Sequence, residues 1–369
     1  MAISSKTARS KTARSKTARS KTARSMGAWQ KFKAQRVGYI SLWALLLLFG
    51  LSLCAELLSN DQPLLVHYQD KNGQGKTYAP IWHNPPETTF GGDFQTPTDY
   101  LDPFIQAQFA QPGNWLLFAP NHYRYNTIHY FASAPNPAPP SRANWLGTDD
   151  QGRDVLARLL YGFRLSVLMA LAVTLLTTVL GAALGALQGY FGGKVDLLGQ
   201  RAEEIWRSMP ELYLFIILAS IFSRSVGLLL LLLTVFGWMG VSAYMRAEYL
   251  RNRNLDYVRA ARALGVGNGR IMLRHILPNA LVPIITLLPF KMVAVIMSLT
   301  ALDFLGLGLP PEAPSLGELL SQAKANLDAW WIGLGTVAVL MATLLLLTLV
   351  GDALRHALDP RRALSGKVS

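Results

Sequence analysis

The strongest constraint on this chain is a series of apolar runs, each long enough to cross a lipid bilayer. Five of them begin near Val37, Leu165, Gly227, Ala280 and Gly333, and each approaches the roughly 20 residues that a spanning helix needs. Within lipid, only helices and closed barrels satisfy their own backbone polar groups. Hydrophobic residues make up 51% of the chain and charged residues only 15%. The sequence therefore predicts an all-α polytopic membrane protein.

A shorter apolar run supplies one further crossing. Met209–Phe222 is too short to span alone, and we expect Pro210 to kink a helix that begins earlier in the chain. We therefore predict about six membrane-spanning helices, the first within residues 31–58. Lys31, Lys33 and Arg36 precede that first helix, and basic residues favour the cytoplasmic side. With an even number of crossings, both termini are expected in the cytoplasm.

The N-terminal tail is a basic repeat. Residues 5–25 contain four copies of KTARS, and we expect residues 1–30 to be disordered because so polar a segment has no core to bury. The eight Lys and Arg of the repeat account for more than half of the formal net charge of +13. Most other basic residues border apolar runs, which argues for membrane orientation and against nucleic acid. A single Cys excludes an internal disulfide framework.

Residues 59–144 predict a small extracytoplasmic domain after the first helix. This segment is rich in Pro, Asn, Asp and aromatic residues, and its strand-like pieces are Leu64–Tyr68, Trp115–Phe118 and Thr127–Phe131. Gly75-Lys76-Thr77 is similar to the end of a phosphate-binding loop, but the leading glycine and the strand–loop–helix context are missing. Its histidines show no metal-ligand spacing.

A polar stretch between two apolar runs, Tyr257–Pro278, predicts a short helix, a glycine and a second helix. Asn254 is placed to cap the first helix, Gly265 to end it, and Asn268 to begin the second. The small side chains in its middle suit close docking against another protein. The alternative is a basic amphipathic loop lying on lipid headgroups.

A second distinctive stretch, residues 144–166, predicts a turn followed by an amphipathic helix from about Asp154. It closely resembles the LGTD-x-x-GRDV-x-x-R-x-x-YG motif of the dipeptide/oligopeptide branch of bacterial binding-protein-dependent ABC importer permeases. The matching residues are Leu146, Gly147, Thr148, Asp149, Gly152, Arg153, Asp154, Val155, Arg158, Tyr161 and Gly162.

The same family explains the polar stretch, which resembles its "EAA" loop, the helix that couples the permease to an ATP-binding subunit. The residues concerned are Tyr257, Arg259, Ala260, Ala261, Arg262, Gly265, Leu277 and Pro278. Arg259 stands where the family usually has Glu, and His275 where it usually has Ile. Asp303–Glu318 resembles a further segment of the branch, and the long insert at 59–144 resembles the Yej-type permeases of microcin C/oligopeptide importers.

The resemblance implies a type I ABC importer permease, with a transport core at 145–360, a coupling loop at 253–278 and a cytoplasmic tail at 361–369. It implies a permease subunit, not an enzyme, that moves peptides or peptide-like compounds across the bacterial inner membrane. Its partners would be a second homologous permease, two ATP-binding subunits or one fused double ATPase, a periplasmic substrate-binding protein and a peptide. No cofactor is expected on this chain, since ATP and Mg belong to the partner subunits.

Lys291 lies inside an apolar run, where a charge is costly and is often functional. It is expected to face the translocation path, to pair with an acid on a neighbouring helix, or to reach toward the headgroups. Two other classes are considered. An ion-coupled secondary transporter calls for intramembrane acids or an inverted repeat, and neither is clear in the sequence. An intramembrane hydrolase calls for paired catalytic residues within spans, and none stands out.

Overall fold

The structure, a computed structural model, describes residues 28–69, 75–128 and 134–358. The KTARS tail and residues 361–369 lie outside these ranges. Five helices among the described residues are long and apolar enough to cross a membrane: Arg36–Leu53, Val155–Phe191, Val226–Asn252, Asn268–Phe304 and Trp330–Leu358. The predicted all-α polytopic fold is confirmed, and residues of the sixth predicted crossing form a shorter apolar helix, Glu211–Ile221.

These spans divide into shorter labelled elements where the helix geometry changes. They are α3 (Arg36–Leu53), α6 (Val155–Phe191), α9 (Val226–Gly237), α10 (Met239–Asn252), α12 (Asn268–Arg270), a π-helical turn (Ile271–Ile276), α13 (Leu277–Phe304) and α15 (Trp330–Leu358). The amphipathic helix expected from Asp154 and the span expected at Leu165–Gly189 form the single helix α6. At 1.5 Å per residue α6 is roughly 55 Å long, so it extends well beyond a hydrocarbon core of about 30 Å.

The expectation of a kink at Pro210 is wrong. Helix α7 (Gly193–Ser208) ends before Met209, and α8 (Glu211–Ile221) begins after Pro210. Both intervening residues have extended backbone, with ψ of 125° and 109°. A proline disfavours helical geometry in the residue before it, so here it separates two helices.

The glycine stripe of α6 brings α10 into close contact. A Cβ on Gly181 would overlap the carbonyl oxygen of Trp238, one on Gly185 would overlap that of Ser242, and one on Gly189 would lie 2.5 Å from that of Arg246. Backbones approach this closely only where side chains are absent. The four-residue spacing therefore fixes the α6–α10 pair along its length.

The segment between α3 and α6 forms a small domain, here called the β-lobe (the described residues of 59–144). Its antiparallel sheet has the order β2-β1-β3, with β1 (Leu65–Gln69), β2 (Gly75–Tyr78) and β3 (Trp115–Leu117). The expected strands at 64–68 and 115–118 are present. Gly75-Lys76-Thr77 lies in β2, in keeping with its rejection as a phosphate loop. Of the third expected strand, Ile128 forms only an isolated bridge with Arg153, and residues 129–131 lie outside the described ranges.

The β-lobe has its own core beneath the sheet. Phe90 ends the short helix η1 (Glu87–Phe90), and α5 (Pro103–Phe109) contributes Ile105 and Phe109. Val66 and Tyr100 complete this buried cluster. The lobe joins α3 through α4 (Ala55–Leu58).

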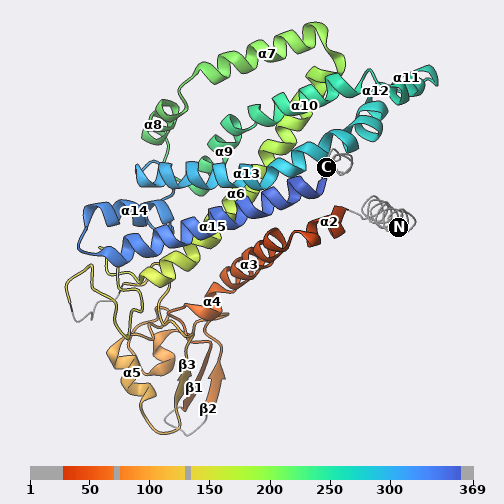
Figure 1. The fold of residues 1–369 in the computed structure, drawn as a ribbon. Helices are drawn as coiled ribbons and strands as arrows, with labels where there is room; N and C mark the ends of the chain where they lie inside the picture. Colours follow the sequence, from red (N-terminus) through yellow and green to blue (C-terminus); the bar gives the residue numbers. More distant parts are fainter. Residues whose placement is uncertain (1–27, 70–74, 129–133, 359–369) are drawn as a thin grey trace, which may run out of the picture.

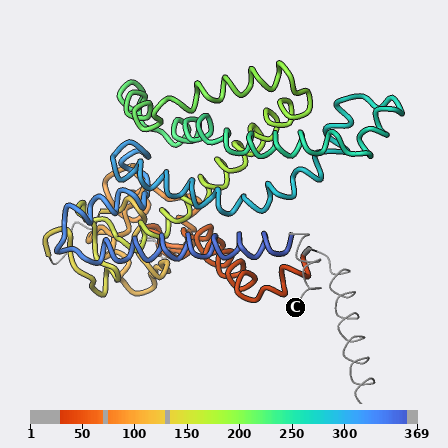
Figure 2. The backbone as a smooth tube through the Cα atoms, turned by 45° about the horizontal axis from the view of Figure 1, so that its top comes forward, coloured from red at the N-terminus to blue at the C-terminus, as the bar shows by residue number. Residues whose placement is uncertain are grey.

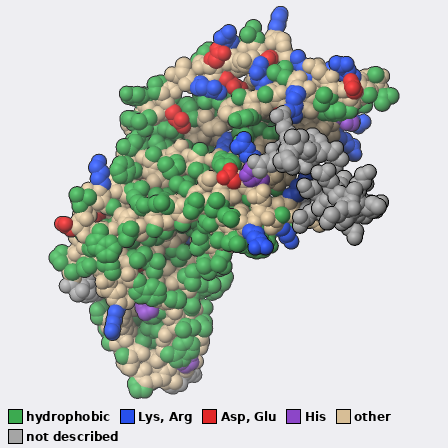
Figure 3. All heavy atoms as spheres, in the orientation of Figure 1, with side chains coloured by type: hydrophobic (Ala, Val, Ile, Leu, Met, Phe, Trp, Pro, Cys, Tyr) green, Lys and Arg blue, Asp and Glu red, His purple; other side chains and the backbone are tan. Residues whose placement is uncertain are grey.

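The β-lobe and the polar loop lie at opposite ends of the molecule (Figure 1). Helix α2 (Ala28–Ala34) packs against the last turns of α15, and α14 (Leu316–Ala325) connects α13 to α15 near the β-lobe. Figure 2 shows α7 on the opposite side of the bundle from α3 and α15. In Figure 3, Lys and Arg side chains gather toward the end that carries α7 and α11 (Asp256–Ala263), while hydrophobic side chains cover the long helices.

Candidate functional site

The polar loop is built around α11, which ends in a complete Schellman motif. The Gly265 N–H donates to the Arg262 carbonyl at 2.9 Å, and the Val266 N–H donates to the Ala261 carbonyl at 3.1 Å. Gly265 has φ of +76°, a left-handed conformation that glycine adopts without steric cost. The expected ending at Gly265 is present. Asn254 does not cap the helix, because Leu255 occupies the N-cap position without a side-chain hydrogen bond.

Hydrogen bonds from the neighbouring helices hold the loop in place. The Tyr190 hydroxyl at the end of α6 lies 2.8 Å from Oδ1 of Asn268, and the Tyr249 hydroxyl on α10 donates to the Met272 carbonyl at 3.0 Å. The Arg253 guanidinium donates to the Gly189 carbonyl at 3.2 Å. Asn268 begins the second helix as expected, so α11 is supported from both sides.

The two faces of α11 differ. Val258 and Ala261 are buried in a cluster that also contains residues of α6, α10 and the π-helical turn, whereas Ala260 is exposed, as is Leu264 (83%). The structure therefore separates two of the small residues of this loop: Ala261 belongs to the chain's own core, and Ala260 belongs to the free surface.

The loop's charged and aromatic residues also differ in their surroundings. The Arg259 side chain is 69% exposed and lies 3.9 Å from the exposed Asp256. Tyr257 is 38% exposed, and its hydroxyl lies 3.3 Å from Oδ1 of Asn252. The Arg262 guanidinium stacks over the Tyr190 ring at 5.2 Å, so it is engaged within the chain.

The second helix of the loop does not stop at Leu277. It runs through the π-helical turn directly into α13, with Pro278 in the first turn of α13. Proline lacks an N–H and cannot donate to the carbonyl four residues earlier. The wider π-turn just before it accommodates that missing bond. Leu277 and Pro278 thus mark a change of helical geometry within one long helix.

The motif at 144–166 forms a buried ion network where α6 begins. Arg153 donates to Asp149 at 2.7 Å and to Glu318 at 3.1 Å. Arg158 donates to the other oxygen of Glu318 at 2.6 Å, and its Nη1 lies 3.6 Å from Asp149. The Arg158 and Asp149 side chains are fully buried. Two arginines and two carboxylates therefore join the start of α6 to α14.

Asp154 connects the same turn to the β-lobe. Its carboxylate caps α6 by accepting from the Ala157 N–H at 2.8 Å, and it accepts from the side-chain amides of Asn121 and Asn144 at 2.9 Å each. Burial raises the pKa of Asp154 above its usual value, and these hydrogen bonds oppose that rise. The β-lobe is thus fixed to the start of α6 through a buried carboxylate.

The rest of the motif shapes the turn. Gly147 and Gly152 have φ of +72° and +79°, and a Cβ on Gly147 would lie 2.6 Å from the Ala138 carbonyl oxygen. The Thr148 hydroxyl accepts from the Ala138 N–H at 2.8 Å, and the Thr148 carbonyl accepts from the Trp331 indole at 3.2 Å. Leu146 packs on the main hydrophobic core. The motif is therefore a structural junction of α6, α14, α15 and the β-lobe.

Two acceptors of this junction were not identified from the sequence as its partners. Glu318 is the third residue of α14 and lies 160 positions from Arg158 in the sequence. Asp303, at the end of α13, accepts from the Leu309 N–H and the Ser315 hydroxyl at 2.6 Å each. Ser315 in turn caps α14 through the Glu318 N–H. The only sequence signal for these contacts was the family-like segment Asp303–Glu318.

Lys291 points into the helix bundle. Its Nζ donates to the Gly237 carbonyl at 3.1 Å, at the junction between α9 and α10. Gly237 and Lys291 line one small cavity with Glu211. Among the described residues, no acid lies within ion-pair distance of Lys291. Of the three alternatives for this residue, a direct ion pair does not match this geometry, and the other two stay predictions.

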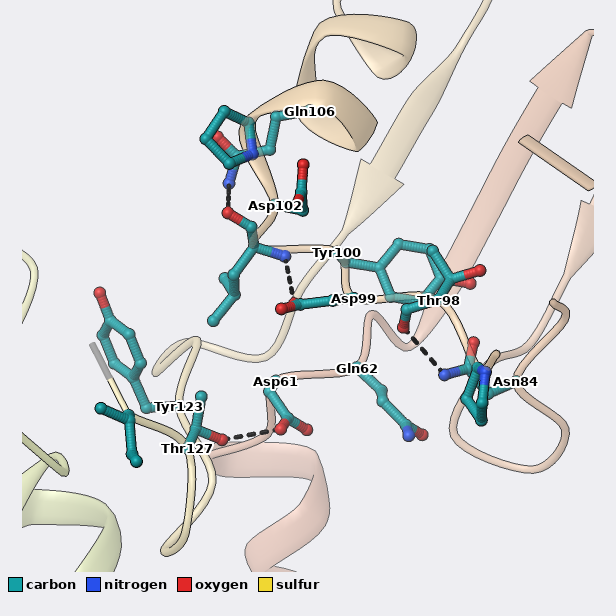
Figure 4. A pocket seen from close by; sticks show the side chains of 14 residues that line it. Asp61, Gln62, Asn84, Thr98, Asp99, Tyr100, Asp102, Gln106, Tyr123 and Thr127 are labelled. Carbon is teal, nitrogen blue, oxygen red and sulfur yellow. Dashed lines mark hydrogen bonds between the residues drawn. The ribbon is translucent and has the colours of Figure 1, made fainter. Parts of the chain in front are cut away.

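The β-lobe carries a cavity of about 790 Å³. Its wall includes Asp61, Asp99 and Asp102 (Figure 4). Asp61 accepts from the Thr127 hydroxyl at 2.7 Å, and Asp99 accepts from the Leu101 N–H at 2.9 Å. The described residues contain no group of three His, Cys, Asp or Glu arranged to hold a metal ion.

Comparisons with known proteins agree with the motifs. Residues 179–364 match the family described as "Binding-protein-dependent transport system inner membrane component". The chain is 50% identical over 335 residues to the inner membrane ABC transporter permease protein YejE of Escherichia coli (strain K12), covering 91% of this chain and 96% of that protein. It is 46% identical over 360 residues to the peptidoglycan transport system permease protein YejE of Agrobacterium fabrum, covering 90% and 92%.

A more distant relative shares the transport core. The dipeptide transport system permease protein DppC of Haemophilus influenzae is 37% identical over 217 residues, which cover 58% of this chain and 74% of that protein.

Proposed function

This chain belongs to the family of binding-protein-dependent transport system inner membrane components, and we propose that it moves peptides or peptide-like compounds inward, driven by ATP. The names of the relatives support the substrate class, since one is a dipeptide permease and another a peptidoglycan permease. Peptidoglycan fragments carry short peptides, so both names agree with a peptide-bearing substrate. The microcin C-type substrate of the Yej resemblance falls in the same class.

The proposed assembly contains this permease, a second homologous permease, two ATP-binding subunits or one fused double ATPase, and a periplasmic substrate-binding protein. ATP and Mg bind the ATP-binding subunits, and this chain carries no cofactor and no hydrolytic activity of its own. The chain spans the inner membrane several times with both termini in the cytoplasm. The excess of basic side chains at the α11 end supports this orientation (Figure 3).

The observation that carries the proposal is the construction of α11. One face of this short helix is buried in the chain's own core, and the other presents Ala260, Leu264 and Arg259 to the surroundings. Because the Tyr190 and Tyr249 hydroxyls hold the loop to α6 and α10, a push on α11 is transmitted to those helices. This arrangement suits an element that receives the movement of an ATP-binding subunit.

The test is co-purification from gently solubilised membranes, followed by uptake in proteoliposomes. We expect the wild-type chain to bring down a second permease and an ATP-binding subunit, and Leu264→Asp to lose the ATP-binding subunit while keeping the second permease. The control is Leu327→Asp. Leu327 is also highly exposed (81%), but it lies between α14 and α15, at the end of the molecule opposite α11. Equal recovery of the ATP-binding subunit with Leu264→Asp would contradict the docking assignment. Uptake that continues without ATP-binding subunits would favour a secondary transporter.

A further inference from the structure

The helices α7 and α8 carry charges beside the middle of a span. Asp196 pairs with Arg246, Glu203 accepts from the Ser242 hydroxyl at 2.6 Å, and the Trp206 indole donates to the Val235 carbonyl at 3.2 Å. Helix α7 therefore runs antiparallel to the span Val226–Asn252, and Ser242 and Val235 lie on either side of that span's midpoint.

Part of the outward face of α7 at this depth is charged, beside the exposed Leu198 and Ile205. The Arg201 and Glu204 side chains are 66% and 59% exposed and lie 2.5 Å apart, and the Arg207 side chain is 61% exposed. Charged groups at membrane depth are strongly disfavoured against lipid and face water or polar protein. This face of the bundle therefore adjoins an aqueous or protein-lined space.

A cavity of about 210 Å³ lies at the start of α8, just after the end of α7. Glu211 of α8 and Lys291 of α13 both line it, together with Phe236 and Gly237 of α9 and Val173 of α6. The described residues contain no ion pair between Glu211 and Lys291. Two opposite charges thus share one small cavity without neutralising each other directly.

Each charge has one favourable local contact. Lys291 donates to the Gly237 carbonyl at the end of α9, and Glu211 sits in the first turn of α8, where the helix dipole favours an acid. These contacts keep the two side chains at the cavity, but they leave the carboxylate without an ionic partner and the ammonium with a neutral acceptor only. A ligand that carries both an anion and a cation matches this pattern.

We propose that the Glu211–Lys291 cavity is a subsite of the translocation path that receives the charged ends of a peptide. Lys291 binds the free C-terminal carboxylate and Glu211 binds the free N-terminal ammonium, each when that end of the peptide passes through the cavity. The volume accommodates a terminal group and not a whole peptide, so the remainder of the substrate lies in the space beside α7. This inference rests on the proposed peptide-import function.

The test measures ATP-dependent uptake by proteoliposomes that contain the complete assembly and its binding protein. The probes are trialanine, its C-terminal amide and its N-acetyl form, and each variant is compared with wild type for each probe. The ratio of variant uptake to wild-type uptake for one probe does not depend on the selectivity of the binding protein, because the binding protein is the same in both measurements. We expect Lys291→Gln to reduce trialanine uptake by about tenfold or more, the size of one charge-assisted hydrogen bond, with little effect on the amide.

Glu211→Gln should show the complementary pattern, with a loss for trialanine and little change for the N-acetyl form. Lys194→Gln and Glu312→Gln are matched controls, since both side chains are exposed and lie away from the cavity. Equal losses for all three probes would overturn the subsite and leave Lys291 as a structural partner of Gly237. Wild-type assemblies that import none of the probes with ATP would instead contradict the peptide-import function itself.

Discussion

Nη2 of Arg158, in the first turns of α6, lies 2.6 Å from Oε2 of Glu318 in α14, and the two residues are 160 positions apart. The Arg158 side chain is fully buried and that of Glu318 is 23% exposed. A buried charge without its partner is strongly disfavoured. This pair therefore fixes how the beginning and the end of the transport core meet.

Removing one partner should destabilise the fold. We expect Arg158→Ala to lower the free energy of unfolding by about 3 kcal/mol or more, because Glu318 and Asp149 lose a buried cation. Thermal unfolding in detergent measures the change. Arg164→Ala is the matched control, since its pair with Glu56 is partly exposed (23% and 37%) and should contribute about 1 kcal/mol or less. Similar losses of unfolding free energy for both variants would show that the Arg158 network stabilises the fold no more than a partly exposed ion pair does.

The α6–α10 contact should not tolerate a methyl group. In Gly185→Ala the added carbon meets the Ser242 carbonyl, so we expect a loss of about 1–3 kcal/mol from overpacking. Gly240→Ala is the control, because a Cβ there meets nothing within 4 Å. That variant should be neutral or up to about 1 kcal/mol more stable, since alanine favours helix. The prediction fails if the two variants unfold at the same temperature.

The left-handed conformation of Gly265 predicts a graded series. Asn tolerates this conformation, whereas a β-branched residue is strained in it. Because a Cβ at this position meets no atom within 4 Å, bulk alone has no effect inside the chain. We expect Gly265→Asn to retain the ATP-binding subunit in co-purification and Gly265→Val to lose most of it. Full retention by Gly265→Val would mean that the backbone turn is not needed for docking.

The Asp303 carboxylate should organise the connection from α13 to α14. It accepts from the Leu309 N–H and the Ser315 hydroxyl, and replacing it with Leu leaves a buried N–H without an acceptor. We expect Asp303→Leu to cost about 1–3 kcal/mol, measured by thermal unfolding. Asp303→Asn keeps one acceptor oxygen and should lower the free energy of unfolding by less than Asp303→Leu does. Equal stability of Asp303→Leu and the wild type would refute this role.

The parts of the fold that follow local rules were predictable from the sequence. Apolar runs predicted the spans, and Gly265 predicted the end of α11. Each depends on residues within a few turns of one another. The family motif was recognised, but its physical role was not, because Arg153 and Arg158 meet a carboxylate that is distant in sequence.

Long-range contacts also explain the features that were predicted wrongly or missed. Pro210 was expected to kink a helix, yet it separates α7 from α8, and only packing decides between these outcomes. Strand β2 was missed because Gly75 and Lys76 have low strand propensity, and pairing with β1 overrides it. Glu211 was not selected, since an acid after a proline is typical of an ordinary helix start; its significance depends on Lys291, which is far along the chain.

The segment that carries the β-lobe's sheet begins and ends at almost the same point. The Asn60 N–H donates to the Asn121 carbonyl and the Asn121 N–H donates to the Leu58 carbonyl, each at 3.0 Å. This pairing joins the chain just before the sheet to the chain just after it. The sheet is therefore a modular insertion, and its length does not affect the geometry of the helices. Such a module can lengthen, shrink or change its surface during evolution while the membrane-embedded machinery stays the same.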